Sequence, residues 1–337
     1  MIRKGIGLAL VLLLGLISPA ASRANDLTYG AWLPYWEMDA ALDEAESLQG
    51  RMDTFIAFAA IFDSSDRVFV PSETHVMLSV LNEPAFQNKD VFISVVNDIE
   101  TAYGEYENKS TSLLTRLFGT PESRSRHIEQ LVALVDMYKP EGLELDYENI
   151  DGDTALWSSY MKLIDEMWSI CRREQIRLRI VLPWDAPLYA TLPKGPEYSV
   201  MCYNLFGYHS GPGPKADIDF LKNTCKLYLN VPGSVRMAFA TGGFEWAGGN
   251  ITALTQSQVM ENLSLAGVEP VRDMYSGAMK ATYQKNGTTY EVWYADGQTL
   301  ARWRDTCIDY GFNSFDIFRL GGNDLEDWSR TLFGTQP

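Results

Sequence analysis

The sequence predicts an α/β protein that forms one (β/α)8 barrel, with a small hairpin-containing insertion before the last helix and strand. Eight short apolar segments alternate with longer segments of helical periodicity along the 337 residues. Such alternation is typical of parallel strands joined by helices. Eight repeats in a chain of this length favour a closed barrel over an open sheet.

The N-terminus has the features of a secretory signal peptide. Two basic residues precede the apolar run Ile6–Ile17, which is short for a membrane span. Small residues at Ser22 and Ala24 then offer a cleavage site. We therefore expect residues 1–24 to be removed and the barrel, residues 25–337, to be secreted or periplasmic; an uncleaved anchor is the alternative.

The expected strands are short segments rich in β-branched and aromatic residues. In chain order they are Thr28–Tyr35, Thr54–Phe62, Val91–Asn97, Gly142–Glu148, Ile176–Pro183, Tyr198–Asn204, Ser234–Thr241 and Asn313–Phe318. Pro140 stands just before the fourth of them, where a proline ends the preceding helix.

The expected helices have apolar residues at helical spacing. They are Arg124–Tyr138, Asp153–Gln175, Lys215–Tyr228, Ser257–Ala266 and Gly297–Tyr310. The region from about 246 to 293 breaks the alternation, because Gly277–Tyr283 and Thr289–Trp293 flank the turn sequence "QKNG" and predict a hairpin. The tract Ala102–Ser125 is long for a connection and is expected as a loop over a cleft.

Composition excludes several classes of partner. The net charge is −16, which repels nucleic acid and anionic lipid and favours a neutral substrate. We expect no nucleic-acid partner, no membrane association after signal cleavage, and a monomer. The three histidines have no metal-ligand spacing, so neither a metal nor a cofactor is expected. Among the four cysteines, a Cys202–Cys225 disulfide and buried free thiols are equally open.

One strand carries three carboxylates on the same face. In "GLELDYENI", apolar residues alternate with Glu144, Asp146 and Glu148. If the apolar residues pack under the helices, the acids point into the barrel, and like charges at that distance raise the pKa of at least one carboxyl. Glu148, nearest the open end, is the candidate general acid, while Asp146 stays ionised or shares a proton with Glu144. The alternatives are a solvated face of an edge strand and a site for a divalent cation.

Aromatic residues stand where several of the predicted strands end. They are Trp36, Trp184, Trp246 and Phe318. Aromatic residues at such positions are often core filler, but a ring of them around the mouth of a barrel suits the C–H faces of a sugar. The sequence therefore predicts a carbohydrate-binding cleft.

Three stretches resemble glycoside hydrolase family 18. "EGLELDYE", ending at Glu148, resembles the family's strand D-G-x-D-x-D-x-E, with Glu in place of two of the Asp residues. "MCYN", Met201–Asn204, resembles Met-x-Tyr-Asp, with Asn204 in place of Asp, and the following "GYHSGPGPKA" resembles relatives of the bacterial spore-cortex enzymes. The stretch "YEVWYADGQTLARWRDTCIDYGFNSFDIFRLGGND" resembles the end of the family's barrel, with Phe318 at the position of a Trp in the floor of the site.

The resemblance implies a retaining, substrate-assisted glycosidase. Glu148 would protonate the glycosidic oxygen, and Asp146, above Glu144, would hold the N–H of the substrate's acetamido group. Tyr203 would align the acetamido oxygen, and Met201 and Asn204 would line the sugar site with the aromatic residues. The implied partner is a glycan that contains β-linked N-acetylglucosamine, either chitin oligosaccharides or peptidoglycan. A barrel that binds amino sugars without turnover is the alternative.

Overall fold

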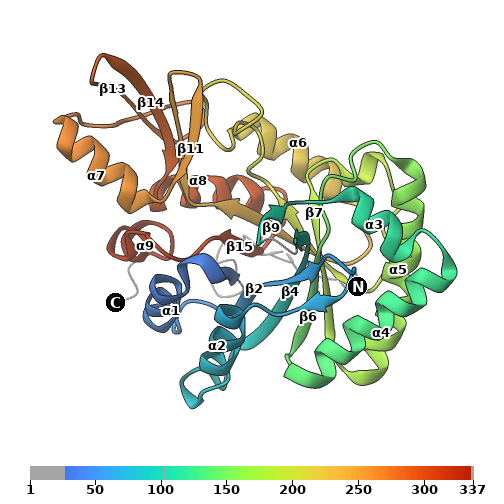
Figure 1. Cartoon of the computed structure of the whole chain (residues 1–337). Helices are drawn as coiled ribbons and strands as arrows, with labels where there is room; N and C mark the ends of the chain where they lie inside the picture. Colours follow the sequence, from blue (N-terminus) through green and yellow to red (C-terminus); the bar gives the residue numbers. More distant parts are fainter. Residues whose placement is uncertain (1–26, 102–103, 335–337) are drawn as a thin grey trace, which may run out of the picture.

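The structure is a computed structural model that describes residues 27–101 and 104–334, so the expected signal peptide lies outside the described part. Eight parallel strands close into a barrel in the order β2-β1-β15-β9-β8-β7-β6-β4, and pairing of β2 with β4 completes the ring (Figure 1). The strands are β1 (Thr28–Pro34), β2 (Thr54–Asp63), β4 (Asp90–Glu100), β6 (Gly142–Asp146), β7 (Arg177–Pro183), β8 (Glu197–Met201), β9 (Ser234–Ala240) and β15 (Ser314–Phe318). The predicted barrel and its eight strands are confirmed. Two short strands, β3 (Val68–Phe69) and β5 (Tyr106–Glu107), pair antiparallel with β2 and β4.

Helices cover the outside of the barrel. They are α1 (Met38–Ser47), α2 (Ser72–Leu81), α3 (Thr111–Phe118), α4 (Pro121–Tyr138), α5 (Thr154–Glu174), α6 (Ile218–Tyr228), α7 (Gln256–Ala266), α8 (Gly297–Ile308) and α9 (Leu325–Thr331). The five predicted helices are confirmed. The prediction of a loop over 102–125 is wrong in part, because α3 lies within that tract and Ser110 accepts a hydrogen bond from the backbone of Leu113 as its N-cap. No helix in the described ranges is both long and apolar enough to cross a bilayer.

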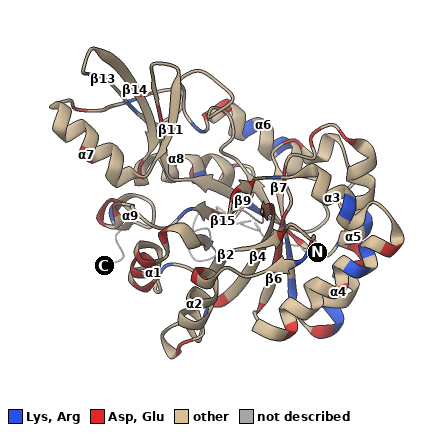
Figure 2. Ribbon diagram, in the orientation of Figure 1, with Lys and Arg blue, Asp and Glu red and all other residues tan. Residues whose placement is uncertain are grey.

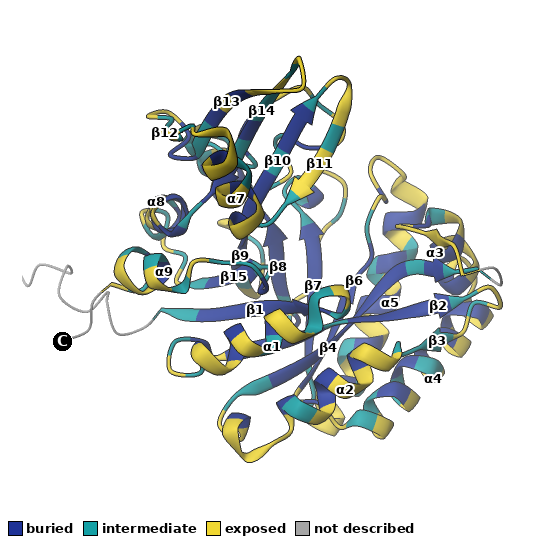
Figure 3. Ribbon diagram, turned by 60° about the vertical axis from the view of Figure 1, so that its left-hand side comes forward, coloured by how far each residue is buried: buried dark blue, intermediate teal, exposed yellow. Residues whose placement is uncertain are grey.

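A second, antiparallel sheet stands above one side of the barrel (Figures 1 and 3). Its order is β11-β10-β14-β13-β12, from β10 (Gly242–Ala247), β11 (Asn250–Leu254), β12 (Val271–Arg272), β13 (Met279–Lys285) and β14 (Thr288–Ala295). The predicted hairpin is β13–β14, and its turn residues Asn286 and Gly287 have the positive φ angles, 52° and 78°, that such two-residue turns require. The hairpin is therefore one part of a larger sheet, which α7 covers on one face.

The barrel strands are buried over most of their length (Figure 3), and many of their apolar residues join the core between strands and helices. A separate apolar cluster is formed by Trp32, Ile56, Phe92, Val181, Met201 and Ala238. On β6, Leu143 and Leu145 join Tyr147, just after the strand, in the core between strands and helices. Acidic and basic residues are interspersed over the outer surfaces of α4 and α5 (Figure 2). Because Leu143 and Leu145 face the helices, the opposite face of β6, which carries the carboxylates, points into the barrel.

Charged residues fill part of the barrel interior. Trp32 donates its indole N–H to Glu144 at 2.7 Å, and Arg179 lies 3.7 Å from the same carboxylate. Arg179 also lies 3.7 Å from Asp316, which Arg236 contacts at 2.8 Å. Buried charges persist only when paired and hydrogen-bonded, and here carboxylates and guanidinium groups alternate. The interior is thus closed below the carboxyl ends of the strands.

Candidate active site

Three adjoining cavities lie at the open end of the barrel. The central cavity, about 460 Å³, is lined by Asp146, Glu148, Tyr203, Trp36 and Phe318 among others. A larger cavity of about 710 Å³ shares Glu148 and Met201 with the central cavity. A smaller one of about 300 Å³ shares Tyr203 and Phe318 with it. Three of the predicted catalytic residues, Asp146, Glu148 and Tyr203, therefore line the same cavity as the predicted aromatic residues Trp36 and Phe318.

The depth of the three carboxylates follows the predicted alternation. Glu144 is fully buried, Asp146 is 6% exposed, and the side chain of Glu148 is 15% exposed. β6 ends at Asp146, so Glu148 lies just beyond the strand. Asn97 of β4 fixes it there: the Glu148 N–H donates to Asn97 Oδ1 at 2.9 Å, and Asn97 Nδ2 donates to the Glu148 carbonyl at 3.2 Å. The prediction that these acids point inward is confirmed by their burial.

Burial acts most strongly on the two deeper acids. Burial raises the pKa of Glu144 to about 7, although Arg179 and the Trp32 indole oppose the rise. Burial, followed by the charges of Glu148 and Glu144, raises the pKa of Asp146 well above its usual range. Burial therefore favours the protonated form of Asp146, while Asp146 Oδ1 and Glu144 Oε2 both lack a hydrogen-bond partner in the described part of the chain, so no hydrogen bond joins these two oxygens.

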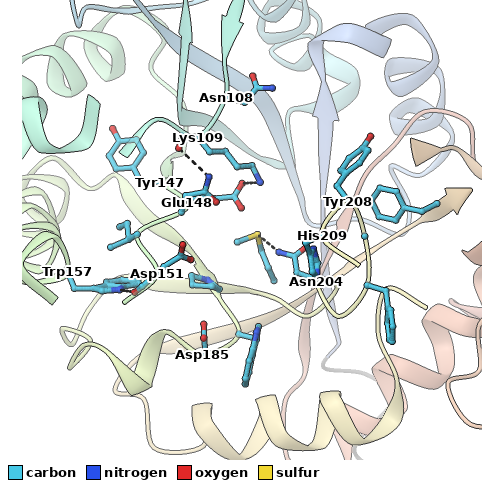
Figure 4. A pocket seen from close by; sticks show the side chains of 18 residues that line it. Asn108, Lys109, Tyr147, Glu148, Asp151, Trp157, Asp185, Asn204, Tyr208 and His209 are labelled. Atoms are coloured by element: carbon cyan, nitrogen blue, oxygen red, sulfur yellow. Dashed lines mark hydrogen bonds and ion pairs between the residues drawn. The ribbon is translucent and has the colours of Figure 1, made fainter. Parts of the chain in front are cut away.

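Lys109 is a residue of the site that the sequence did not indicate. Its ammonium lies 2.6 Å from Glu148 Oε1. Figure 4 shows the two side chains next to each other. Its backbone N–H donates to Asp98 at 2.7 Å, and its φ is 54°. Burial alone would lower the pKa of Lys109, but the carboxylates of Glu148 and Asp146 outweigh it and raise the pKa. Nothing in the local sequence marks this lysine, because its position depends on the fold of the segment between β5 and α3.

Tyr203 forms one wall of the central cavity and Phe318 forms its floor. Their rings stack with centroids 5.9 Å apart and an angle of 14°. Phe318 also meets Trp32 and Phe58 edge to face, at 6.0 and 5.8 Å. Burial, and then the charges of Glu148 and Asp146, raise the pKa of Tyr203 well above its usual value, so its hydroxyl stays a hydrogen-bond donor.

The remaining predicted sugar-binding residues divide into two groups. Trp36 lines the central cavity, Trp184 the largest, Met201 both of these, and Asn204 all three. Trp246 is the exception, and its prediction as a residue of the cleft is wrong.

Trp246 lies in β10 of the second sheet rather than at the end of a barrel strand. It is 9% exposed and donates its indole N–H to the Ser210 carbonyl at 3.1 Å. Phe244, two residues earlier on the same strand, lines both flanking cavities instead. The prediction took Trp246 as a residue that follows the end of the seventh barrel strand. In the structure the chain continues from β9 directly into β10, which contains Trp246.

The other residues around the groove were not predicted. Tyr35, Phe58, Asp98 and Tyr106 line the central cavity, and Lys215 and Arg319 the smallest. Figure 4 shows Asn204, Tyr208 and His209 on a different side of the largest cavity from Glu148. Tyr208, His209, Lys215 and Arg319 stand on loops, whose positions a strand pattern does not give.

Within the described ranges, no group of three or more His, Cys, Asp or Glu side chains is arranged to hold a metal ion. His127 is buried, with its ring 2.7 Å from the Tyr147 hydroxyl, and His209 lines the largest cavity. All four cysteines are buried free thiols, so of the two states left open for Cys202 and Cys225 the structure contains the unpaired one.

Comparison with known proteins adds evidence on the fold. No family model matches the chain. The uncharacterized glycosylase YvbX of Bacillus subtilis (strain 168) is 20% identical over 262 residues, which cover 72% of this chain and 74% of YvbX.

Solved structures are similar over most of the chain. The spore cortex-lytic enzyme SleL of Bacillus cereus has a TM-score of 0.74 at 15% identity, over 91% of this chain and 73% of that one. A chitinase from Chromobacterium violaceum ATCC 12472 has a TM-score of 0.74 at 15% identity, over 90% and 97%. A class V chitinase from Nicotiana tobaccum, solved with NAG4, has a TM-score of 0.71 at 13% identity, over 91% and 98%. At these identities the comparison shows a shared architecture: the chain has the chitinase-like (β/α)8 fold.

Proposed function

We propose that the protein is a glycoside hydrolase that cleaves β-linked N-acetylglucosamine glycans with retention, using the substrate's acetamido group as the nucleophile. The observation that carries the proposal is that Asp146, Glu148 and Tyr203 line one cavity with Phe318 at its base. The motifs that resemble glycoside hydrolase family 18 contribute these same residues. The fold shared with chitinases and a cortex-lytic enzyme supports the same class of substrate.

In the proposed reaction, Glu148 gives its proton to the glycosidic oxygen as the bond to the anomeric carbon breaks. The acetamido carbonyl oxygen forms a bond to that carbon, giving an oxazolinium ion, and Glu148, now a carboxylate, takes a proton from the water that opens it. Asp146, with an unpaired oxygen, accepts the acetamido N–H and offsets the positive charge. The Tyr203 hydroxyl donates to the acetamido oxygen and holds it near the reacting carbon.

The alternative is a barrel that binds amino sugars without turnover, and the Lys109–Glu148 ion pair is the observation that favours it. A general acid must carry a proton, and an ammonium 2.6 Å away favours the carboxylate. The Lys109 side chain is 45% exposed, however, so a bound sugar can displace it. We retain catalysis as the proposal on that ground.

A fluorogenic di-N-acetylchitobioside separates the two. The wild type should release the fluorophore, and Glu148→Gln should lose activity by a factor on the order of 10² to 10⁴, the usual contribution of a general acid. Glu129→Gln, the same substitution at an exposed position of α4, is the matched control and should keep the activity of the wild type. Silence of both the wild type and Glu148→Gln, with equal affinity for the oligosaccharide, would establish the binding protein instead.

Two further parts of the proposal concern the whole chain. We propose that residues 1–24 direct secretion or periplasmic export and that the remaining chain acts as a monomer. Since the proposed reaction needs no metal, a chelator should leave the rate unchanged, whereas a thiazoline that imitates the oxazolinium ion should inhibit.

A further inference from the structure

The smallest of the three cavities has an unusual charge. Lys109, Lys215 and Arg319 contribute to its wall, and no Asp or Glu is among the residues that line it. It adjoins the central cavity, since Tyr203 and Phe318 line both. In a chain whose net charge is −16, this is a local region of opposite sign next to the proposed catalytic residues.

Two of these three cations already have carboxylate partners. Lys109 pairs with Glu148 at 2.6 Å, and Arg319 pairs with Glu37 through both of its terminal nitrogens, at 2.8 and 3.0 Å. Their charges are therefore largely compensated within the protein.

Lys215 has no such partner: no carboxylate of the described chain lies within 4.0 Å of its ammonium. Its Nζ donates one hydrogen bond, to the Thr241 carbonyl at 2.6 Å, and lies 5.3 Å from the centroid of the Phe244 ring. An ammonium has three N–H donors, and among the described residues only the Thr241 carbonyl accepts one of them.

Leaving this ammonium without an anion is unfavourable. Burial, and then the charge of Arg319, lower the pKa of Lys215 to about 7. Buried lysines without a counter-charge are rare, because desolvation of a charge is compensated only by a partner of opposite sign. The position is therefore prepared for an anionic group that the protein itself does not supply.

We propose that Lys215 binds a carboxylate carried by the glycan, so that the preferred substrate is an acidic glycan in which acetamido sugars alternate with carboxylate-bearing sugars. The inference rests on the proposed function, which puts an acetamido sugar in the adjoining cavity. The exposed Tyr208, which also lines the smallest cavity, is positioned to contribute a hydroxyl. Chitin lacks such a carboxylate, whereas the lactyl ether of N-acetylmuramic acid in peptidoglycan and the uronic acid of a glycosaminoglycan both supply one.

The global charge argued for a neutral substrate, and the local charge argues for the opposite. A carboxylate held against a partly desolvated ammonium gains more than one held by an exposed lysine, because the surrounding dielectric constant is lower. The acidic outer surface slows encounter with such a glycan but does not act on the bound complex.

Calorimetric binding to the full chain with Asp146→Asn, for which turnover should be low, tests this and keeps Glu148 as the partner of Lys109. The ligands are an N-acetylglucosamine–N-acetylmuramic acid tetrasaccharide, its methyl ester, tetra-N-acetylchitotetraose, and a tetrasaccharide of N-acetylglucosamine and glucuronic acid. We expect at least one free-acid ligand to bind about tenfold more tightly than its neutral counterpart; whichever acid does so identifies the source of the carboxylate.

Variants of Lys215 test whether this residue causes the difference in affinity between the acid and the ester. Lys215→Met, similar in volume and uncharged, should remove the preference for the acid over the ester, and Lys215→Arg should keep most of it. Lys222→Met, which removes an exposed charge on α6, is the matched control and should change nothing. Thermal unfolding of each variant checks that it is folded.

Equal affinity of the parent protein for both acidic tetrasaccharides and for the neutral ones, or a preference for the acid that survives in Lys215→Met, would overturn the proposal. Failure of the hydrolase proposal would look different: no turnover of any glycan by the wild type, with the acid-over-ester preference intact.

Discussion

The contact between Lys109 and Glu148 decides how the site has to work. In the free protein the ammonium stabilises the carboxylate, whereas the first proposed step needs the protonated acid. We predict that Lys109→Met keeps at least the activity of the wild type at every pH tested, because it removes only a partly exposed ion pair, which contributes under about 1 kcal/mol. Initial rates on the fluorogenic substrate between pH 4 and 9 measure this.

Lys280→Met, on the second sheet, serves as the control for loss of one positive charge, and its profile should match the wild type. Inactivity of Lys109→Met at every pH would instead make Lys109 a required binding group and contradict the view that substrate displaces it.

Asp146 is expected to trade stability for function. Its pKa is raised in the folded protein, chiefly by burial, so the folded state holds its proton more tightly than the unfolded chain does. Ionisation of Asp146 therefore lowers the free energy of unfolding as the pH rises above the usual range of an aspartate. Asp146→Asn removes that penalty but replaces the charged acceptor for the acetamido N–H with a neutral amide, which cannot offset the positive charge of the oxazolinium ion.

We predict that Asp146→Asn loses activity by about 10²-fold. Its free energy of unfolding should be higher than that of the wild type by on the order of 1 kcal/mol, so that it unfolds at a higher temperature. The gain should grow from pH 5 to pH 8. Asp136→Asn, exposed on α4, is the control. A destabilised Asp146→Asn would show that the carboxylate is held by favourable contacts, against the interpretation given above.

At the scale of elements, strands were easier to predict than helices. The eight barrel strands are buried on both sides, so each appears in the sequence as an apolar or alternating run bounded by polar residues. α1 was not predicted, because only Ala41, Glu44 and Ala45 of its ten residues are buried and no apolar stripe results. The continuation from β9 into β10 was missed because Gly242 and Gly243, at the start of β10, read as a break in the chain, and with it the position of Trp246 was missed.

The link between β4 and Glu148 can be tested at this scale. Asn97 donates to and accepts from the backbone of Glu148, and both atoms belong to a buried amide. We predict that Asn97→Ala lowers kcat about tenfold with a smaller change in KM, since it misplaces the acid rather than the sugar. Steady-state kinetics measure both constants. Asn82→Ala, on a surface turn after α2, should leave them unchanged; an effect confined to KM would contradict a positioning role.

The contact between α4 and the carboxylate strand gives a pH dependence of stability. Burial lowers the pKa of His127 to about 3, while its ring contacts the Tyr147 hydroxyl at 2.7 Å. The unfolded chain therefore binds a proton that the folded chain does not, and stability falls as the pH drops from about 6.5 toward 3, by roughly 1.4 kcal/mol per pH unit.

We predict that His127→Gln flattens this acid limb, although its stability at neutral pH is lower. Urea unfolding between pH 4 and 7 measures the slope, with His75→Gln, exposed on α2, as the control that keeps it. An unchanged slope in His127→Gln would assign the acid sensitivity to other groups.

For the whole molecule, the repeated strand–helix pattern of the sequence predicts the architecture. Several residues of the proposed site lie on loops, which this pattern does not place. Eight strand-helix repeats predicted the closed barrel, and the spacing of Asp146 and Glu148 predicted that both acids share a face. Lys109 and Lys215 were not predictable, because loops bring them to the groove from segments with no periodic pattern. The net charge of the chain also gave no indication of the basic residues that line the smallest cavity.

The account depends on the acetamido group of the substrate taking part in the reaction, and a series of acyl groups on one substrate tests this most directly. The fluorogenic chitobioside and its analogue with N-trifluoroacetyl in place of N-acetyl should differ in kcat/KM by two or more orders of magnitude, because fluorine withdraws electrons from the attacking carbonyl oxygen. Equal rates on the two substrates would mean that a protein carboxylate attacks instead, and would contradict the roles given to Asp146 and Tyr203.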